Sequence, residues 1–395
     1  MPPDKLAKAI QLSHWRTGLY FGGTAWMILT LWLLVRFGAG QGIARAAERM
    51  FRPAWVQGLV AIPIWLVIFS ALQVPEALLG HHVSLHFGLS VEGWAAWWGD
   101  WFKSLALTVL VGTFVLSMLY ALMRRSPRRW WIWFWAFTVP VVVAGTWIAP
   151  VVVDPLFNHF EPLSRTDPGL VARLEQVAAK GGLDIPPSRM FLMDASRRVT
   201  TPNAYVTGIS ASKRIVVWDT TIKEETPNEI LFTYGHEQGH YVLHHIPKGI
   251  AFAAVMFLIF YWIGFYLLRA VIERKGVGWG IFAADHWTSL GLVLLLLVVL
   301  SFLADPIANA FSRHIEHQAD VYGQEVIHGI VPDPQATVMH SFCSDAQLWL
   351  DNPRPNPFVE FWTYSHPSTE ERAAFAEHYD PWLHGSQPKY FRKTQ

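Results

Sequence analysis

Residues 233–245, which read TYGHEQGHYVLHH, contain two histidines that could share one metal ion. His236 and His240 are four residues apart, so on an α-helix both imidazoles lie on one face, one turn apart. Glu237 follows the first histidine and would point toward a water molecule at the same ion. This is the HExxH arrangement of a zinc hydrolase. The same histidines could also lie at a helix end without binding metal, so the interpretation depends on companion residues.

A zinc site for hydrolysis needs a third protein ligand and one position left for water. The third histidine of the longer HExxHxxGxxH pattern is absent, because Ile246 stands in its place, and the single cysteine, Cys343, cannot build a cysteine-ligated site. Glu316, in the segment SRHIEHQAD, is the better candidate. Asp320 lies one helical turn further on, where it could accept the second N–H of a ligand histidine. The sequence also leaves open an alternative ligand set among His244, His245, His314 and His317.

The composition is that of a membrane protein. Hydrophobic residues make up 52% of the 395 residues and charged residues 15%, and the mean hydropathy is +0.25. We therefore expect an integral, multi-pass protein in contact with membrane lipid. A net charge of +1, with Lys and Arg in small groups, argues against a nucleic-acid partner. Six apolar stretches are candidate spans: residues 17–35, 55–79, 104–123, 130–153, 249–268 and 288–303.

These stretches divide the chain into four parts. Residues 1–153 would carry four membrane helices, 154–248 the first part of a catalytic domain, 249–303 a transmembrane helical hairpin, and 304–395 the second part of the catalytic domain. Because a hairpin returns the chain to the same side of the membrane, His240 and Glu316 can meet. Helical rise places these two residues ~14 and ~20 Å from the span ends. The site should therefore lie near the membrane surface or in a cavity that opens from it.

The first catalytic part shows the pattern of a small α+β unit. Apolar residues recur at helical spacing over residues 170–178, and Gly181-Gly182 closes that helix. Three short runs, at residues 190–193, 204–209 and 214–218, predict a small sheet. Thr226-Pro227-Asn228-Glu229 is a capping box that begins the helix carrying HExxH, and Pro247 is expected to end it.

With these motifs in order, the chain resembles a known group, the membrane zinc metalloproteases that include CAAX prenyl protease 1 and, more distantly, the bacterial HtpX proteases. The matching features extend from about Trp130 to Arg372 and comprise APVVVDPLFNHFEPL, TPNAYVTGISASKRIVVWDT, HEQGH, DPIANAFSRHIEHQAD and SHPSTEER. The resemblance implies a mainly α membrane protein. About six transmembrane helices would surround a chamber, with a small α+β zinc protease domain of gluzincin type.

The resemblance also implies roles for individual residues. His236, His240 and Glu316 would bind one Zn²⁺, and Glu237 would be the catalytic base. Asn203 and Ala204 would lie on the strand that aligns the substrate. His366 and Arg372 would face the active site, with His366 as a candidate donor to the oxyanion.

The substrate implied by the resemblance is a peptide or protein, and CAAX prenyl protease 1 implies one that is prenylated at its C-terminus. The group also contains members that act on unmodified membrane proteins, so a quality-control protease of the HtpX kind is an alternative. A catalytically inactive scaffold is another, although it would be expected to lack Glu237 or a ligand, and none is missing. A transporter could carry an intramembrane charge such as Glu76, but Pro75 and the nearby span end favour an interfacial position.

The chain departs from the group in one respect and leaves its orientation open. Eukaryotic prenyl proteases have seven spans, whereas six are counted here. The resemblance implies a cytosolic catalytic site. The positive-inside rule predicts an extracytoplasmic one, because the short segments opposite the catalytic parts carry most of the basic residues, among them Arg124, Arg125, Arg128 and Arg129. A reporter fused after Gln395 and active only in the cytoplasm distinguishes the two orientations.

Overall fold

The computed structural model describes residues 1–208, 213–383 and 385–391. Within them, six helical segments are long and apolar enough to cross a membrane, which agrees with the number of spans predicted from the sequence. Most of their apolar side chains are not covered by protein, as expected of surfaces that face lipid. The helices are α1 (Pro3–Arg36), α3 (Ala54–His86), α4 (Trp94–Arg125), α5 (Trp130–Ile148), α11 (His245–Trp279) and α12 (Leu290–Val326).

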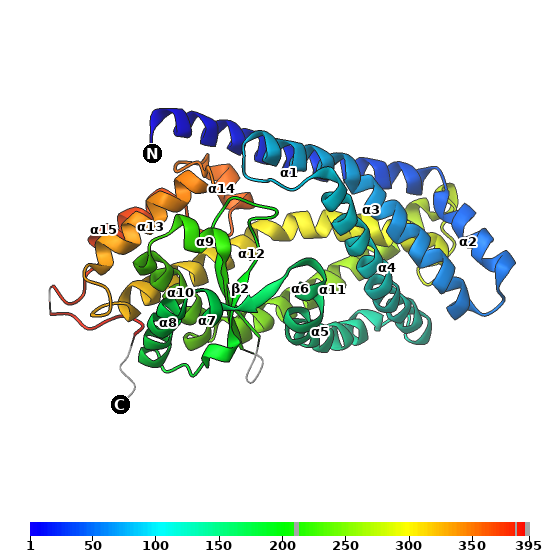
Figure 1. Cartoon of the computed structure of the whole chain (residues 1–395). Coiled ribbons are helices and arrows are strands. Elements are labelled where there is room, and N and C mark those ends of the chain that lie inside the picture. The colour runs from blue at the N-terminus through cyan, green and yellow to red at the C-terminus, as the bar shows by residue number, and fades with distance from the viewer. Residues whose placement is uncertain (209–212, 384, 392–395) are drawn as a thin grey trace.

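The membrane helices and the catalytic elements lie at opposite ends of an elongated molecule, and α1 extends along both (Figure 1). Each end has its own hydrophobic core. A helix that the sequence analysis did not identify, α2 (Ala39–Met50), lies at the membrane end and buries Ala44 and Ala47. It has only twelve residues, and Arg45 and Arg49 interrupt its apolar pattern, so it gives no spanning signal.

The catalytic end contains a four-stranded sheet. The strands are β1 (Phe160–Pro162), β2 (Met190–Met193), β3 (Ala204–Thr207) and β4 (Arg214–Trp218), in the order β1-β2-β4-β3. The β2–β4 pair is parallel and the other two pairs are antiparallel. β2 and β4 have the predicted bounds, β3 ends two residues earlier than predicted, and residue 209 lies outside the described residues. The order leaves β3 at an edge of the sheet, which matters for substrate binding below.

Helices cover this sheet and complete the catalytic end. The helix predicted over residues 170–178 is α8 (Pro168–Lys180), followed by Gly181 as its C-cap. The longer elements of the second part are α13 (Pro334–Leu348), α14 (Pro357–Thr363) and α15 (Thr369–His378). The remaining short elements are a π-helix (Ala149–Val153), α6 (Asp154–Phe157), α7 (Leu163–Thr166), α9 (Asp219–Glu224) and two 3₁₀ turns (Pro187–Arg189 and Trp287–Ser289).

The HExxH helix is α10 (Pro227–Val242), and it begins at the predicted capping box. Thr226 accepts the amide N–H of Glu229, whose carboxylate accepts the amide N–H of Thr226. The predicted C-terminal end of α10 was wrong. The helix stops at Val242, where His244 adopts a left-handed conformation with φ of 57°, and Pro247 lies in the first turn of α11. Proline is tolerated there because first-turn amides have no helical acceptor.

α12 is one continuous helix that runs from the membrane end into the catalytic end (Figure 1). The predicted division of the chain at residues 153, 248 and 303 stays a prediction, and residue 303 falls inside α12. α12 packs closely against α10 because glycines line the contact. A methyl group added to Gly323 would lie 2.8 Å from the amide nitrogen of His236, and one added to Gly235 would lie 2.8 Å from Val326. This close approach brings the two halves of the HExxH and Glu316 motif together.

Candidate metal centre and catalytic site

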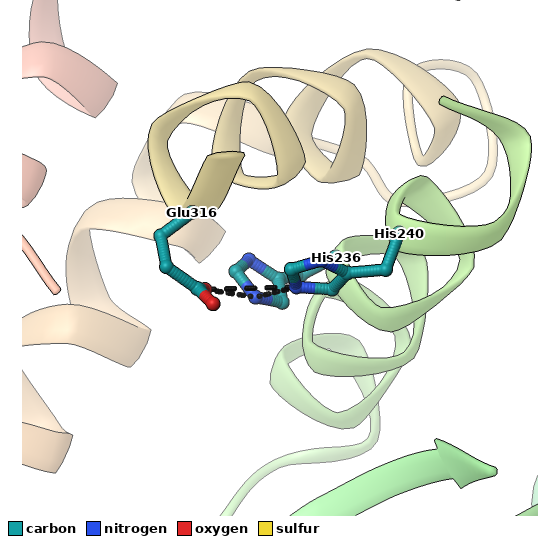
Figure 2. A group of neighbouring side chains, drawn as sticks. All are labelled: His236, His240 and Glu316. Carbon is teal, nitrogen blue, oxygen red and sulfur yellow. Dashed lines mark hydrogen bonds and ion pairs between the residues drawn. The ribbon is translucent and has the colours of Figure 1, made fainter. Parts of the chain in front are cut away.

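Three side chains from α10 and α12 converge on one point, as Figure 2 shows. Oε2 of Glu316 lies 3.1 Å from Nε2 of His236 and 3.6 Å from Nε2 of His240, and the two Nε2 atoms are 3.2 Å apart. One ligand atom from each residue lies within 4.8 Å of the others. Among the described residues this is the one group of three or more His, Cys, Asp or Glu side chains with that geometry.

The outer nitrogen of His236 is held by a carboxylate. Oδ1 of Asp320 lies 2.8 Å from Nδ1 of His236, and Asp320 also accepts two hydrogen bonds from Arg372, at 2.8 Å from Nε and 2.6 Å from Nη2. A carboxylate paired with a guanidinium stays ionised, so it accepts a hydrogen bond from the Nδ1–H of His236. Nε2 of His236 is therefore left with a lone pair that faces the convergence point.

Nδ1 of His240, which points away from the convergence point, is held by a chain of two hydrogen bonds that the sequence analysis did not identify. Nδ1 of His240 lies 3.0 Å from Nδ1 of His245, and Nε2 of His245 lies 3.1 Å from Oε1 of Gln318. An amide oxygen only accepts, so His245 carries its proton on Nε2 and accepts from Nδ1 of His240. Nε2 of His240 then also presents a lone pair. The sequence shows that His245 is close to His240 along the chain, but only the fold shows that the two imidazoles contact each other.

This arrangement fits a cation. Two imidazole lone pairs and a carboxylate oxygen face one another, and Oε2 of Glu316 is buried without a hydrogen-bond donor. Burial alone would lower the pKa of His236, but the neighbouring carboxylates outweigh burial and raise it. The site therefore stabilises positive charge. The donor set of two histidines and one glutamate is the set found in catalytic zinc sites that leave a position for water.

The alternative histidine ligands do not form a second set among the described residues. His244 lies in the turn between α10 and α11, and His245 stands behind His240. The ring of His317 packs edge-on against Phe375, with centroids 4.7 Å apart. His314 contacts the amide nitrogen of Gln318 at 2.8 Å.

Glu237 lies next to this centre and beside the edge strand. Its Oε2 is 3.5 Å from the amide nitrogen of Val206 in β3. Burial raises the pKa of Glu237, while the two histidines oppose that shift. A carboxylate with a raised pKa accepts a proton more readily than an ordinary surface carboxylate.

Within the part of the chain that the structure describes, the predicted substrate strand, β3, pairs with another strand at one edge only. Ala204 is buried and pairs with Val217 of β4. The backbone of Asn203 is fixed by the Thr221 hydroxyl, which lies 2.7 Å from its amide nitrogen and 2.5 Å from its carbonyl oxygen. The Asn203 side chain remains exposed. An exposed strand edge can accept an extended peptide as an additional strand.

His366 reaches the centre from the loop that follows α14. Its Nε2 lies 3.2 Å from Oε2 of Glu316, and its Nδ1 lies 3.0 Å from the Ser365 hydroxyl. Arg313 of α12 fixes this loop by donating to two carbonyl oxygens, at 3.1 Å to Glu360 and 2.6 Å to Tyr364. Asn309, one turn earlier, donates to the carbonyl of Trp362 at 2.6 Å. Sequence reasoning missed both residues, because their partners are backbone atoms about fifty positions away.

Comparison with known proteins adds to this geometry. Residues 164–380 match the model of peptidase family M48, and residues 1–159 match a family described as the CAAX prenyl protease N-terminal, five membrane helices. The chain belongs to peptidase family M48. It is an integral, multi-pass membrane metalloprotease that acts on a peptide or protein substrate. Residues 1–159 contain four helices that are long and apolar enough to cross a membrane.

Several relatives match most of this M48 chain. A Bacillus subtilis protein named uncharacterized metalloprotease YhfN is 31% identical over 377 residues, which cover 95% of this chain and 86% of that protein. CAAX prenyl protease 1 of Saccharomyces cerevisiae is 27% identical over 337 residues, covering 80% and 71%. The crystal structure of S. mikatae Ste24p superposes with a TM-score of 0.82 at 21% identity, covering 96% of this chain and 90% of that one. The fold is thus the expected one, with membrane helices around a chamber and a small α+β protease domain.

A cavity of about 770 Å³ lies beside the candidate metal centre. Four residues singled out from the sequence line it: Asn203, Ala204, His366 and Arg372, together with Glu237. The guanidinium of Arg372 reaches the cavity wall while it holds Asp320. The structure thus brings the base candidate and the substrate-strand candidates to one cavity, and His366 links that cavity to the ligand candidate Glu316.

Proposed function

We propose that this chain is a zinc-dependent endopeptidase in which His236, His240 and Glu316 bind one Zn²⁺. The observation that carries the proposal is the convergence of two imidazole lone pairs and one buried carboxylate oxygen beside Glu237. Family membership supports a metal, and the donor set supports zinc.

Zinc held there would act as a Lewis acid that polarises the scissile carbonyl and makes water more acidic. Glu237 would take the proton from the attacking water and pass it to the leaving amine. His366 would donate a hydrogen bond to the oxygen on which negative charge develops. Asp320 and His245 would hold the two ligand histidines in the required tautomers, and Arg372 would keep Asp320 ionised. No covalent enzyme intermediate is needed.

The substrate would lie extended along the free edge of β3. β3, residues 204–207, has its free edge on the side away from β4, where the Glu237 carboxylate contacts the amide of Val206. Pairing through backbone atoms aligns a scissile bond without reading much sequence. Asn203, at the start of this edge and exposed to the cavity, would bind a backbone group of the peptide.

Two substrate classes are candidates. The relatives named CAAX prenyl protease 1 support a prenylated protein C-terminus. The mixed lining of the cavity, with several charged side chains near Glu237, supports an unmodified membrane protein as the second candidate. Incubation of the purified chain with a prenylated CAAX peptide and its unmodified counterpart, with and without a chelator, distinguishes them. Cleavage of the prenylated peptide alone supports the first class, and equal cleavage of both supports the second.

Metal analysis tests the enzyme itself. We expect about one zinc per chain, Glu316→Ala to lose both zinc and proteolysis, and Glu237→Gln to keep zinc while losing proteolysis. Glu224→Gln, on the nearby helix α9 and paired only with Lys223 at 3.0 Å, is the matched control and should behave as the unaltered chain. A Glu237→Gln variant with full activity would remove Glu237 as the base.

A further inference from the structure

The cavity beside Glu237 is lined by carboxyl groups that make no ion-pair contact within the described residues, although the Arg372 guanidinium opposes the burial that raises the pKa of one of them, Asp345. Two arginines line it, and each is already paired: Arg16 lies 3.1 Å from Asp351, and Arg372 binds Asp320. Glu225 and Asp345 line the same cavity, and neither forms an ion pair with any residue that the structure describes. The wall formed by these two residues therefore presents two carboxyl groups that a cation on the substrate side could bind in ionised form.

Glu225 is almost completely enclosed, yet it is poorly satisfied. Only 8% of the residue is exposed, and its single hydrogen bond among the described residues is a long one, 3.5 Å from the Thr233 hydroxyl to Oε2. Its other oxygen opens to the cavity without a donor. Asp345 has no side-chain hydrogen bond in the described part of the chain. Burial raises the pKa of Glu225 to about 8 and that of Asp345 to about 7, and the charge of Asp345 adds to the shift of Glu225.

Buried carboxylates with a structural role look different in this protein. Glu325 is fully buried and accepts three backbone amides, from Lys389 at 2.5 Å, Tyr390 at 2.9 Å and Phe391 at 2.7 Å. Glu229 is 3% exposed and is bound by the Thr226 amide and by His340. Because buried charge is costly without partners, an unsatisfied pair that faces a substrate cavity indicates that the partner comes from outside.

We propose that Glu225 and Asp345 form a subsite for a positively charged group of the substrate, the side chain of an arginine or lysine close to the cleaved bond. The inference rests on the proposed protease function and adds a specificity to it. A divalent ion is a poor occupant, because the described residues place no third acidic or histidine ligand with this pair. An amine or guanidinium needs only hydrogen-bond acceptors, so it could bind between the two carboxyl groups, and its single positive charge would balance one ionised carboxylate.

The test uses blocked peptides that the unaltered chain cleaves. Each of four positions on either side of the cleaved bond carries arginine or citrulline, its neutral isostere, and kcat/KM is measured for every pair. At one position we expect arginine to be preferred at least about tenfold. The preference should fall to about one in the Glu225→Gln/Asp345→Asn double variant and to intermediate values in the single variants. Glu224→Gln should keep the full preference.

The outcomes separate the subsite from the protease function. A ratio near one at every position, or a preference that persists in the double variant, overturns the subsite. If blocked peptides show no preference at any position but their unblocked counterparts are cleaved faster, and this gain is lost in the double variant, the pair binds an α-amine and the side-chain subsite is overturned. Chelator-sensitive cleavage of the citrulline peptides supports the protease function whatever the ratio is. Absence of cleavage for all peptides overturns that function and the subsite with it. Zinc content shows whether each variant has kept its fold.

Discussion

Replacement of Arg313 by alanine should slow catalysis through His366 without removing the metal. The guanidinium of Arg313 holds both ends of the segment between Glu360 and Tyr364, and His366 follows two residues later. Nε2 of His366 is 3.2 Å from Glu316, but its side chain is half exposed, so packing alone does not fix it. Loss of the guanidinium releases the loop that carries this imidazole.

The structure bounds the size of the effect. Hydrogen bonds from a charged group contribute about 1.5–3 kcal/mol each, and Arg313 makes two. Removal of one oxyanion donor lowers kcat by about 10²–10³-fold, and a residue that acts through His366 cannot cost more than His366 itself. We therefore expect Arg313→Ala to lower kcat by roughly 10–100-fold. KM and zinc content should change little, because neither β3 nor the ligands depend on Arg313.

A double-mutant cycle gives the decisive assay. With purified protein and one cleaved peptide, Arg313→Ala should lower kcat in the unaltered chain but change it by less than about twofold in the His366→Ala background. Arg354→Ala removes an exposed arginine that pairs with Glu370 and is the matched control. If Arg313→Ala is equally damaging with and without His366, or if it strips the zinc, the reasoning is refuted.

Three further outcomes are expected. Gly323→Ala should destabilise the protein by about 1–3 kcal/mol and weaken zinc binding, because the methyl group meets the His236 amide. Gly249→Ala, where a methyl group meets nothing within 4 Å, should not lower the melting temperature and, because Gly249 lies in α11, should raise it slightly. His245→Ala should weaken zinc affinity about 10–100-fold, because Nδ1 of His240 loses its hydrogen-bond acceptor. Competition with a chelator measures the affinity, and an unchanged value would contradict this role of His245. Burial raises the pKa of Glu225 to about 8, so the folded state holds a proton that the unfolded state has lost. This group should lower stability from about pH 5 to pH 8 by up to ~1.4 kcal/mol per pH unit. Thermal unfolding of Glu225→Gln should show a smaller fall with pH, because Asp345, whose pKa burial raises to about 7, still contributes.

Much of the fold was predictable because the signals are local. A capping box at Thr226 begins α10, glycines close α8, and uninterrupted apolar stretches mark the membrane helices. The errors have local causes as well. Pro247 was expected to end the HExxH helix, but a proline in a first turn costs no hydrogen bond, and the break is made by the left-handed backbone of His244. β1 has three residues, too few for a periodic pattern.

The candidate ligands were predictable in part for the same reason. His236 and His240 share a helix face by spacing alone, and Glu316 and Asp320 share another. What the sequence could not show is the crossing of these helices, and hence which partners stand behind each ligand. His245 and Gln318 are 73 positions apart, and their contact exists only because α10 and α12 meet at small residues. The cation subsite proposed at Glu225 and Asp345 depends in the same way on tertiary packing, because Glu225 follows α9 and Asp345 lies on α13.

One face of α12 connects the membrane to the metal site. Asp305, Asn309, Arg313, Glu316 and Asp320 are spaced four, four, three and four residues apart, so they form a single stripe along the helix. Asp305 accepts a hydrogen bond from Tyr20 of α1. Asn309 and Arg313 donate to backbone carbonyls of α14 and of the loop that carries His366. Glu316 and Asp320 contact the imidazole of His236. Because the helix is unbroken along this stripe, a shift of α1 against α12 would displace Glu316 relative to α10. The membrane helices therefore help to set the geometry of the metal site itself.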